Sequence, residues 1–240
     1  INKKGIGKLS FKRDVFKSTI TYKPNKDSKI LDNIDLILNQ NKVYGLIGKN
    51  GAGKTTLIKT LSSVFNNNVF TLKYFKFFDK EVQLSSEFYR QNKYTVFTES
   101  ESFLNWTFLQ YLEMVCQLYN CSIERRRLEF LVNGFKFEEY CQKEIRDLST
   151  GNKKKVFLIV GLYLRRPLLI LDEPFDGLDF ESTEFLYKML LEYKQYGTVL
   201  LSTHFAESVV RVCDYLYILE NAHINLFQGN VSEWLESIRK

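Results

Sequence analysis

The sequence predicts an α/β fold with a mostly parallel sheet, into which a helical lobe is inserted. A short buried strand, 42–47, leads through a glycine-rich loop into a helix with an apolar period. Further along the chain, strand-like 168–172, helix-like 181–196 and strand-like 198–203 alternate, as they do in parallel sheets. Residues 103–145 lie between these two regions and follow a helical period instead. These observations indicate an α/β core that is interrupted by helices.

The N-terminal third of the chain is typical of an antiparallel β subdomain. Residues 18–38 contain two strand-like runs around a Pro-Asn-Lys-Asp turn. The many aromatic residues in 69–97 indicate edge strands, with a short helix predicted within 82–93. We therefore expect this subdomain to precede the helical lobe.

No internal repeat or linker divides the chain, so we expect a single domain over residues 1–240. The core and the β subdomain are predicted at about 1–98 and 147–240, and the helical lobe at about 99–146. Within the lobe, Leu109, Leu112, Val115 and Cys116 share one helix face, and Leu128, Leu131 and Val132 share another.

Composition favours a globular protein over a membrane-spanning one. Apolar residues make up 45% of the 240 residues, which is ample for a core. The longest apolar run, 156–164, is much shorter than the ~20 residues that cross a bilayer. The basic residues in 1–14 have no apolar segment behind them, so no secretory signal is expected.

Cysteine spacing and net charge exclude only a few classes of function. The four cysteines lack the spacing of metal ligands, which favours reduced thiols in the cytosol. A net charge of +6 is compatible with nucleic acid, an anionic membrane surface or phosphorylated ligands. The densest arginine run, 125–127, is interleaved with acids, so a solvated helix face is the favoured interpretation.

The run 48–55 matches G-x-x-x-x-G-K-[ST], the pattern of a phosphate-binding loop. Its glycines let the backbone turn so that successive N–H groups point at a β-phosphate. Lys54 would bring a positive charge to the β- and γ-oxygens, and Thr55 would offer its hydroxyl to Mg²⁺. The loop residues expected to contact nucleotide are Gly48, Asn50, Gly51, Ala52, Gly53, Lys54, Thr55 and Thr56.

Two other strand ends carry residues suited to nucleotide hydrolysis. Asp172 follows a buried strand and is expected to hold the Mg²⁺ hydration shell. Glu173 comes next, where a carboxylate can orient or deprotonate an attacking water. His204 is expected to contact the γ-phosphate or to orient Glu173. The plainer alternatives are a solvated acid at Glu173 and a structural histidine at His204.

Taken in order, these motifs resemble those of the nucleotide-binding domain of ABC (ATP-binding cassette) ATPases. The phosphate loop 48–56 is followed by a signature-like LSTGN at 148–152 and a Walker B-like LLILDEP at 168–174. A D-loop-like DGLD at 176–179 and a switch-like STH at 202–204 complete the set. The resemblance spans nearly the whole chain. It implies a P-loop NTPase core of the RecA-like type, with ATP and Mg²⁺ as cofactors and ATP hydrolysis as the activity.

The resemblance also implies that two such domains pack head to tail around the nucleotide. The helix after the signature would then point its N-terminus at the γ-phosphate that the other domain holds. Ser149, Gly151 and Asn152 would contact that nucleotide, and Asp179 would lie at the same shared site. The lysines at 153–155 would add positive charge there, with solvated lysines as the alternative.

Two positions are placed by the family pattern and carry alternatives. Tyr22 lies where family members stack an aromatic ring on adenine, although it could instead face the core. The usual glutamine at Mg²⁺ is replaced by Thr98, whose shorter hydroxyl would reach the metal through water or a shifted backbone. Glu99 is the alternative metal ligand, because a carboxylate suits a hard cation.

For function, the resemblance implies the ATP-hydrolysing subunit of a membrane transporter. Its partners would be a separate transmembrane permease and a second nucleotide-binding subunit, identical or different. The run 168–182 resembles two-component exporters of drugs or antimicrobial peptides, so export is expected. The aromatic run 103–112 would line a groove for a permease helix, or serve core packing.

The expected location is cytoplasmic, on the inner face of the cell membrane through the permease, and no nucleic acid is expected as a partner. A soluble ABC ATPase that acts on the ribosome, nucleic acid or iron–sulfur assembly is the alternative.

Overall fold

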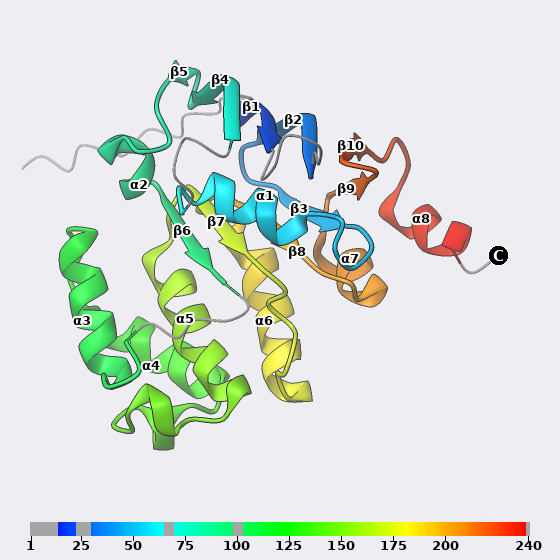
Figure 1. Ribbon diagram of the computed structural model, residues 1–240. Coiled ribbons are helices and arrows are strands. Elements are labelled where there is room, and N and C mark those ends of the chain that lie inside the picture. The colour runs from blue at the N-terminus through cyan, green and yellow to red at the C-terminus, as the bar shows by residue number, and fades with distance from the viewer. Residues whose placement is uncertain (1–13, 23–29, 65–69, 98–102, 239–240) are drawn as a thin grey trace, which may run out of the picture.

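The computed structural model describes residues 14–22, 30–64, 70–97 and 103–238, and its largest sheet has six strands in the order β10-β9-β3-β8-β7-β6 (Figure 1). All neighbouring strands in this sheet are parallel except the antiparallel pair β9 and β10. The mostly parallel sheet predicted from the sequence is therefore confirmed. Its strands are β3 (Val43–Ile47), β6 (Lys93–Val96), β7 (Leu168–Leu171), β8 (Thr198–Ser202), β9 (Tyr215–Glu220) and β10 (His223–Leu226).

A second sheet, in the order β2-β1-β4-β5, is antiparallel throughout and confirms the predicted N-terminal β subdomain. Its strands are β1 (Asp14–Tyr22), β2 (Leu31–Asn39), β4 (Phe70–Phe77) and β5 (Lys80–Glu81). The helix predicted within 82–93 is the shorter α2 (Glu87–Gln91). It starts late because Ser86 caps it, accepting a hydrogen bond from the Tyr89 N–H.

The segment predicted to be helical forms α3 (Phe108–Leu118) and α4 (Arg125–Gly134). Two short 3₁₀ turns follow before the next long helix. The predicted apolar faces are mostly buried, as Leu112 on α3 and Leu131 on α4 illustrate, while Leu109 and Leu128 are half-buried. The helical lobe thus packs through the two faces that the sequence indicates.

The remaining helices pack beside the six-stranded sheet (Figure 1). The helix α5 differs from the others because every residue from Lys154 to Leu164 is buried. It packs against α3 and α4 on one side and β6 on the other, so it joins the lobe to the sheet. Among the helices that the structure describes, none is long and apolar enough to cross a bilayer. The remaining helices are α1 (Lys54–Leu61), α5 (Thr150–Leu164), α6 (Phe180–Tyr193), α7 (Ala206–Val212) and α8 (Val231–Ile238).

The six-stranded sheet separates two large apolar clusters. Alternate side chains of a strand point to opposite faces, so Leu169 and Leu171 of β7 join one cluster while Leu168 and Ile170 join the other. The first cluster also contains the buried residues of α3, α4 and α5. The lobe and this face of the sheet therefore share one continuous core, which fixes α5 relative to β7.

Candidate functional site

Three polar segments meet at one edge of the parallel sheet. The strands β3, β7 and β8 are neighbours in the order β3-β8-β7 and run parallel, so their carboxyl ends lie side by side. The phosphate loop follows β3, Asp172 follows β7, and His204 follows β8. Ligands of open α/β sheets bind at such carboxyl ends. The topology thus brings together residues that are up to 156 positions apart, from Gly48 to His204.

The phosphate loop requires glycine for two physical reasons. Gly51 and Gly53 have φ angles of 80° and 106°, which side-chain-bearing residues rarely adopt. A Cβ added to Gly48 would lie 2.4 Å from the Leu219 carbonyl oxygen, so a side chain there would clash with the backbone of β9. The helix α1 begins at Lys54, directly after the loop. The loop therefore leads into a helix N-terminus, whose free N–H groups favour a bound anion.

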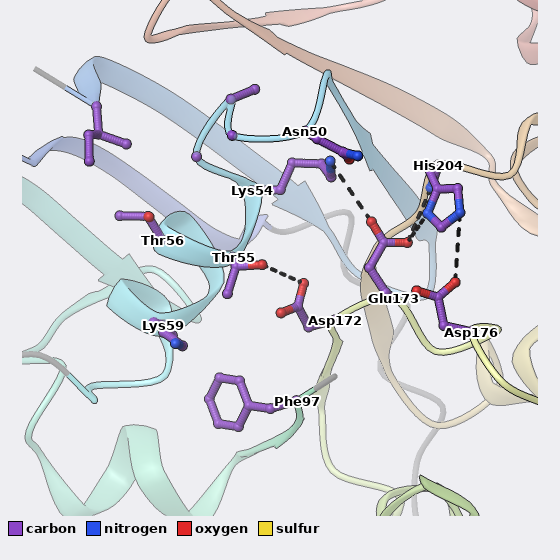
Figure 2. A pocket seen from close by; sticks show the side chains of 14 residues that line it. Asn50, Lys54, Thr55, Thr56, Lys59, Phe97, Asp172, Glu173, Asp176 and His204 are labelled. Atoms are coloured by element: carbon purple, nitrogen blue, oxygen red, sulfur yellow. Dashed lines mark hydrogen bonds and ion pairs between the residues drawn. The ribbon is translucent and has the colours of Figure 1, made fainter. Parts of the chain in front are cut away.

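Lys54, Glu173 and His204 form a connected group in front of the loop (Figure 2). The Lys54 Nζ donates to the Gly48 carbonyl at 2.8 Å and lies 3.9 Å from the Glu173 Oε1. The other carboxylate oxygen of Glu173 is 3.0 Å from the His204 Nδ1, and it accepts the His204 N–H at 3.2 Å. Both Glu173 oxygens thus have partners, and the carboxylate is oriented on two sides.

Asp172 and Thr55 form the end of the site that suits a metal ion. The Thr55 hydroxyl donates to the Asp172 Oδ1 at 3.3 Å, and the Ser202 hydroxyl donates to the same oxygen at 2.7 Å. Asp172 is 1% exposed, so its carboxylate is oriented by the protein rather than by bulk water. One hydroxyl and one carboxylate fit Mg²⁺, which takes one or two protein oxygens beside phosphate and water.

The residues surround a cavity of about 610 Å³, a volume within the usual range for cofactor sites. Ile30, Lys59, Phe97 and Asp176 also line it, and the sequence reasoning missed these four. Gly48 does not line it, because its carbonyl is used by Lys54 and its Cα faces β9. The expected residues that do line it are Asn50, Gly51, Ala52, Gly53, Lys54, Thr55, Thr56, Asp172, Glu173 and His204.

The signature-like segment lies apart from this cavity. Ser149 caps α5, and its hydroxyl accepts the Asn152 N–H at 3.3 Å. A Cβ added to Gly151 would lie 2.2 Å from the Gly177 carbonyl oxygen, so glycine is needed for close packing on the 176–179 loop. Ser149, Gly151 and Asn152 are all described, and none of them lines the cavity of its own chain. Their contact with a nucleotide stays a prediction.

Comparison with known proteins decides the family. A family profile described as ABC transporter matches residues 31–176, which is more than half of the chain. The chain belongs to the ABC transporter family of ATP-binding proteins. Membership implies nucleotide binding and ATPase activity in general.

Two relatives illustrate the range of the ABC family to which the chain is similar. The putative ABC transporter ATP-binding protein AlbC of Bacillus subtilis (strain 168) is 41% identical over 202 residues, which is 83% of this chain and 84% of AlbC. The bacitracin transport ATP-binding protein BcrA of Enterococcus faecalis is 26% identical over 225 residues, which is 89% of this chain and 68% of BcrA.

Solved structures share the ABC fold. One described as the ATP-binding subunit of an ABC transporter has a TM-score of 0.80 at 24% identity and covers 94% of this chain and all of its own. The ADP conformation of MJ1267, an ATP-binding cassette, has a TM-score of 0.73 at 20% identity and covers 95% of this chain and 96% of its own. The predicted P-loop NTPase fold with an inserted helical lobe is therefore confirmed.

Two of the three lysines that follow the ABC signature are buried, which contradicts the interpretation of solvated lysines for these two. Lys154 and Lys155 are each 4% exposed, so neither is solvated. The Lys154 Nζ donates to the Glu173 carbonyl at 2.8 Å, and the Lys155 Nζ donates to the Phe135 carbonyl at 3.0 Å. Both ammonium groups have partners in their own chain, and the expectation that they add charge for a nucleotide stays a prediction. Lys153 is only half-buried.

Asp179, at the end of the D-loop-like segment, is a helix cap in this ABC domain. Its carboxylate accepts the Ser182 N–H at 2.8 Å and pairs with the Lys155 Nζ at 2.6 Å. Burial raises the pKa of Asp179, but hydrogen bonds from Lys155 and Ser182 outweigh burial and lower this pKa to about 2. Asp179 does not line the cavity of its own chain, and its contact with a nucleotide stays a prediction.

Lys155→Met tests this interpretation of the second buried lysine. We expect the free energy of unfolding to fall by ~1–3 kcal/mol, because the Phe135 carbonyl and Asp179 lose a charged donor. Urea denaturation measures the change. The matched control is Lys153→Met, which removes one charge from the same helix turn and should stay within ~0.5 kcal/mol of the unchanged chain. Equal losses in both variants would contradict a structural role specific to Lys155.

Ser202 is a further polar residue beside the site to which sequence reasoning gave no role. Its hydroxyl donates to Asp172 and accepts the Glu173 N–H at 2.9 Å, so one side chain orients both neighbours. The only signal was its position at the end of a strand beside Asp172, within the switch-like STH run. A serine there also fits plain strand packing, so the sequence alone did not separate the two roles.

Three positions named from the ABC pattern lie beyond what the structure describes. Tyr22 ends β1, but its side chain is not among the described ones. Thr98 and Glu99 lie outside the described residues. The adenine contact of Tyr22 and the choice between Thr98 and Glu99 at the metal therefore stay predictions.

Proposed function

We propose that this chain is the ATP-hydrolysing subunit of a membrane transporter. The observation that carries the proposal is the meeting of Lys54, Asp172, Glu173 and His204 at one cavity, at the ends of adjacent parallel strands. Thr55 and Asp172 would hold Mg²⁺. Bound there, the ion would neutralise charge on the β- and γ-phosphates.

Each of the chain's own residues at the cavity would then have a separate role in ATP hydrolysis. Lys54 exchanges its contacts with the Gly48 carbonyl and Glu173 for phosphate oxygens. Glu173, with one oxygen released by Lys54, orients a water molecule and accepts its proton. His204 keeps the other Glu173 oxygen in place and lies 3.9 Å from Asp176 through Nε2. Each step uses a group that already faces the cavity.

A second nucleotide-binding subunit would complete the site by head-to-tail packing. Support comes from α5, whose first residues Ser149 and Thr150 are exposed and form a capped helix N-terminus without an acid in its first turn. Such an end favours an anion. The cavity of the same chain does not receive this helix end, so the nucleotide of a second copy is the fitting anion.

The transmembrane partner would dock near the start of α3. Trp106 is 37% exposed beside a hollow of about 420 Å³, which Asn105, Gln110, Glu113, Met114 and Gln117 also line. Phe108 and Leu112 of the same run are fully buried, so only part of the aromatic run serves the core. An exposed aromatic ring with a thioether nearby suits a short amphipathic helix of a permease.

Export is the proposed direction, from the exporter-like run 168–182, and the likeness to the bacitracin transport ATP-binding protein BcrA supports a transport function. The chain would then lie on the cytoplasmic face of the cell membrane, held there by the permease. A soluble ABC ATPase that acts on the ribosome, nucleic acid or iron–sulfur assembly is the competing function.

Affinity purification from detergent-solubilised cells separates the two functions. We expect the tagged chain to retain a polytopic membrane protein, and a Trp106→Ala, Met114→Ala variant to lose it while still binding ATP. The matched control is Leu118→Ala, an exposed apolar residue of α3 that does not line the hollow. Retention of ribosomes or nucleic acid instead of a membrane protein would favour the soluble ATPase.

A further inference from the structure

Glu173 has an unusual backbone. Its φ angle is 46°, in the left-handed region that residues with a Cβ rarely adopt. Such a conformation persists only where the surroundings hold it. The groups that hold the Glu173 peptide therefore set the direction of its carboxylate.

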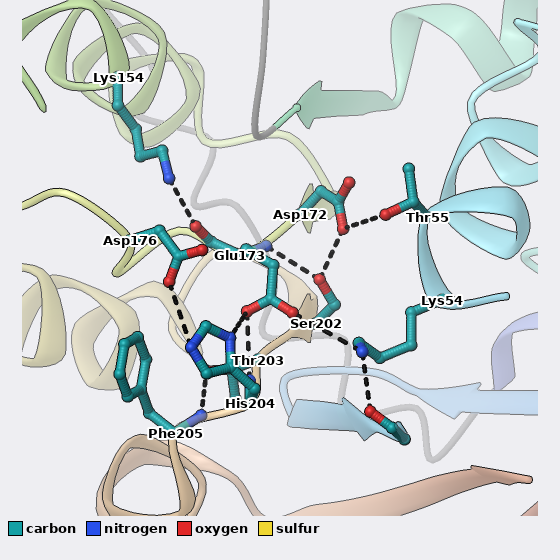
Figure 3. Close-up of polar contacts among 11 residues, drawn as sticks. Lys54, Thr55, Lys154, Asp172, Glu173, Asp176, Ser202, Thr203, His204 and Phe205 are labelled. Atoms are coloured by element: carbon teal, nitrogen blue, oxygen red, sulfur yellow. Dashed lines mark hydrogen bonds and ion pairs between the residues drawn. The ribbon is translucent and has the colours of Figure 1, made fainter. Parts of the chain in front are cut away.

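Contacts to Glu173 come from three parts of the fold (Figure 3). From α1, the Lys54 Nζ lies 3.9 Å from the Glu173 Oε1. Ser202 accepts its N–H, and His204 binds its carboxylate; both belong to the end of β8. The carbonyl oxygen accepts a hydrogen bond from the Lys154 Nζ at 2.8 Å and a longer one from the Asp176 N–H at 3.3 Å, within its own turn. Lys154 belongs to α5, so it is the contact that links Glu173 to the helix bearing the signature-like segment.

The setting of Lys154 is costly for an ammonium group. Burial lowers the pKa of Lys154, while the negative charges of Asp176, Glu173 and Asp172 oppose that lowering. An apolar residue would avoid the desolvation cost at a site that is 4% exposed. The lysine therefore has a role that packing alone does not explain, and its hydrogen bond among the described residues identifies the Glu173 carbonyl as its target.

We propose that Lys154 is a positioning residue that holds the left-handed Glu173 backbone and so aims the carboxylate into the nucleotide cavity. The inference rests on the proposed hydrolysis by Glu173. It also predicts coupling between two sites, since Ser149 begins the same helix and would face the second copy's nucleotide. A shift of α5 on that contact would reach Glu173 through Lys154, which lies roughly one helical turn further along.

Lys154→Met tests the proposal, because methionine fills similar space without a donor or a charge. We expect kcat for phosphate release to fall by about 10–100-fold, the loss that a misplaced catalytic group produces. The affinity for a fluorescent ATP analogue should change by less than about twofold, because the phosphate loop is untouched. Lys154→Arg, which keeps a charged donor, should recover at least a third of the lost rate. Lys188→Met, at an exposed lysine of α6 that does not line the cavity, is the control and should keep both values.

A double-mutant cycle separates positioning from general damage. In a Glu173→Gln background, Lys154→Met should lower the residual rate by less than about twofold, because the group that Lys154 positions is already lost. The proposal would be overturned if the rate loss of the double variant equalled the product of the two single losses. It would also be overturned if Lys154→Met left kcat unchanged. If Lys154→Met does not fold, Lys154→Gln replaces it, with the same expectation because its shorter side chain holds the carbonyl poorly.

The cycle also distinguishes the two levels of inference. Normal hydrolysis by Glu173→Gln alone would remove Glu173 from the mechanism, and the proposed function would fail with it. Loss of hydrolysis by Glu173→Gln beside normal hydrolysis by Lys154→Met would overturn only the role of Lys154.

Discussion

Glu173→Gln is expected to lower ATP hydrolysis by ~10²–10⁴-fold, the contribution of a general base, while ATP still binds. The amide keeps the shape of the carboxylate but cannot accept a proton from water. Lys54, Thr55 and Asp172 keep their positions, since none of their hydrogen bonds uses the Glu173 carboxylate. Removal of one negative charge 3.9 Å from the Lys54 Nζ should leave ATP affinity equal or higher, because the γ-phosphate is an anion.

Two measurements check this expectation on the same protein. Phosphate release gives the rate, and light scattering with ATP and Mg²⁺ should detect a dimer that persists because its nucleotide is not consumed. The matched control is Glu207→Gln, a carboxylate of α7 that is 78% exposed beside Arg211 and should keep the normal rate. Phosphate release by Glu173→Gln within about tenfold of normal would exclude Glu173 as the base.

The sequence alone was sufficient to predict the part of the site that lies at the ends of strands. Val43–Ile47 and Leu168–Leu171 are fully buried strands, and a buried parallel strand places whatever follows it at the carboxyl edge. We could therefore predict, without knowledge of distant contacts, that the loop after β3 and the acids after β7 meet. His204 follows β8 in the same way. Local order along the chain was enough to predict these neighbours.

The lysines show where such reasoning stops. Lys154 binds a carbonyl 19 residues later, and Lys155 binds a carboxylate 24 residues later and a carbonyl 20 residues earlier. Nothing in a run of three lysines indicates these partners. The helix α5 is buried on all sides from Lys154 onward, so it lacks the polar face from which solvent exposure is normally predicted.

A different limit applies to Ser149, Gly151 and Asn152. Their predicted ligand belongs to a second copy, so the fold of one chain positions the helix end but supplies no partner for it. The structure does add a reason for Gly151 that the motif alone lacks. Close packing on the Gly177 carbonyl excludes a side chain there, which ties the signature helix to the 176–179 loop.

The largest expected effect on binding comes from Lys54→Ala. Lys54 is the cation nearest to the predicted β- and γ-phosphate positions, and it is 7% exposed, so its charge is only weakly screened by water. One charge-assisted contact is worth ~1.5–3 kcal/mol, which corresponds to a loss of ~10–100-fold in nucleotide affinity. The Lys54 Nζ also donates a hydrogen bond to the Gly48 carbonyl at 2.8 Å, which holds the two ends of the phosphate loop together. The variant therefore loses order in the loop as well as a positive charge.

Titration with a fluorescent ATP analogue measures the loss, with and without Mg²⁺. The matched control is Lys42→Ala, at the other end of β3, where the lysine side chain is 42% exposed and 4.0 Å from Asp214. That variant also removes one positive charge and should bind nucleotide normally, because Lys42 precedes β3 and its ammonium lies at the opposite edge of the sheet from the phosphate loop. If both variants kept full affinity, the glycine loop would be a structural turn rather than a phosphate site. A loss confined to Lys54→Ala would place the phosphates where β3 ends, since only a charge at that edge of the sheet would then matter.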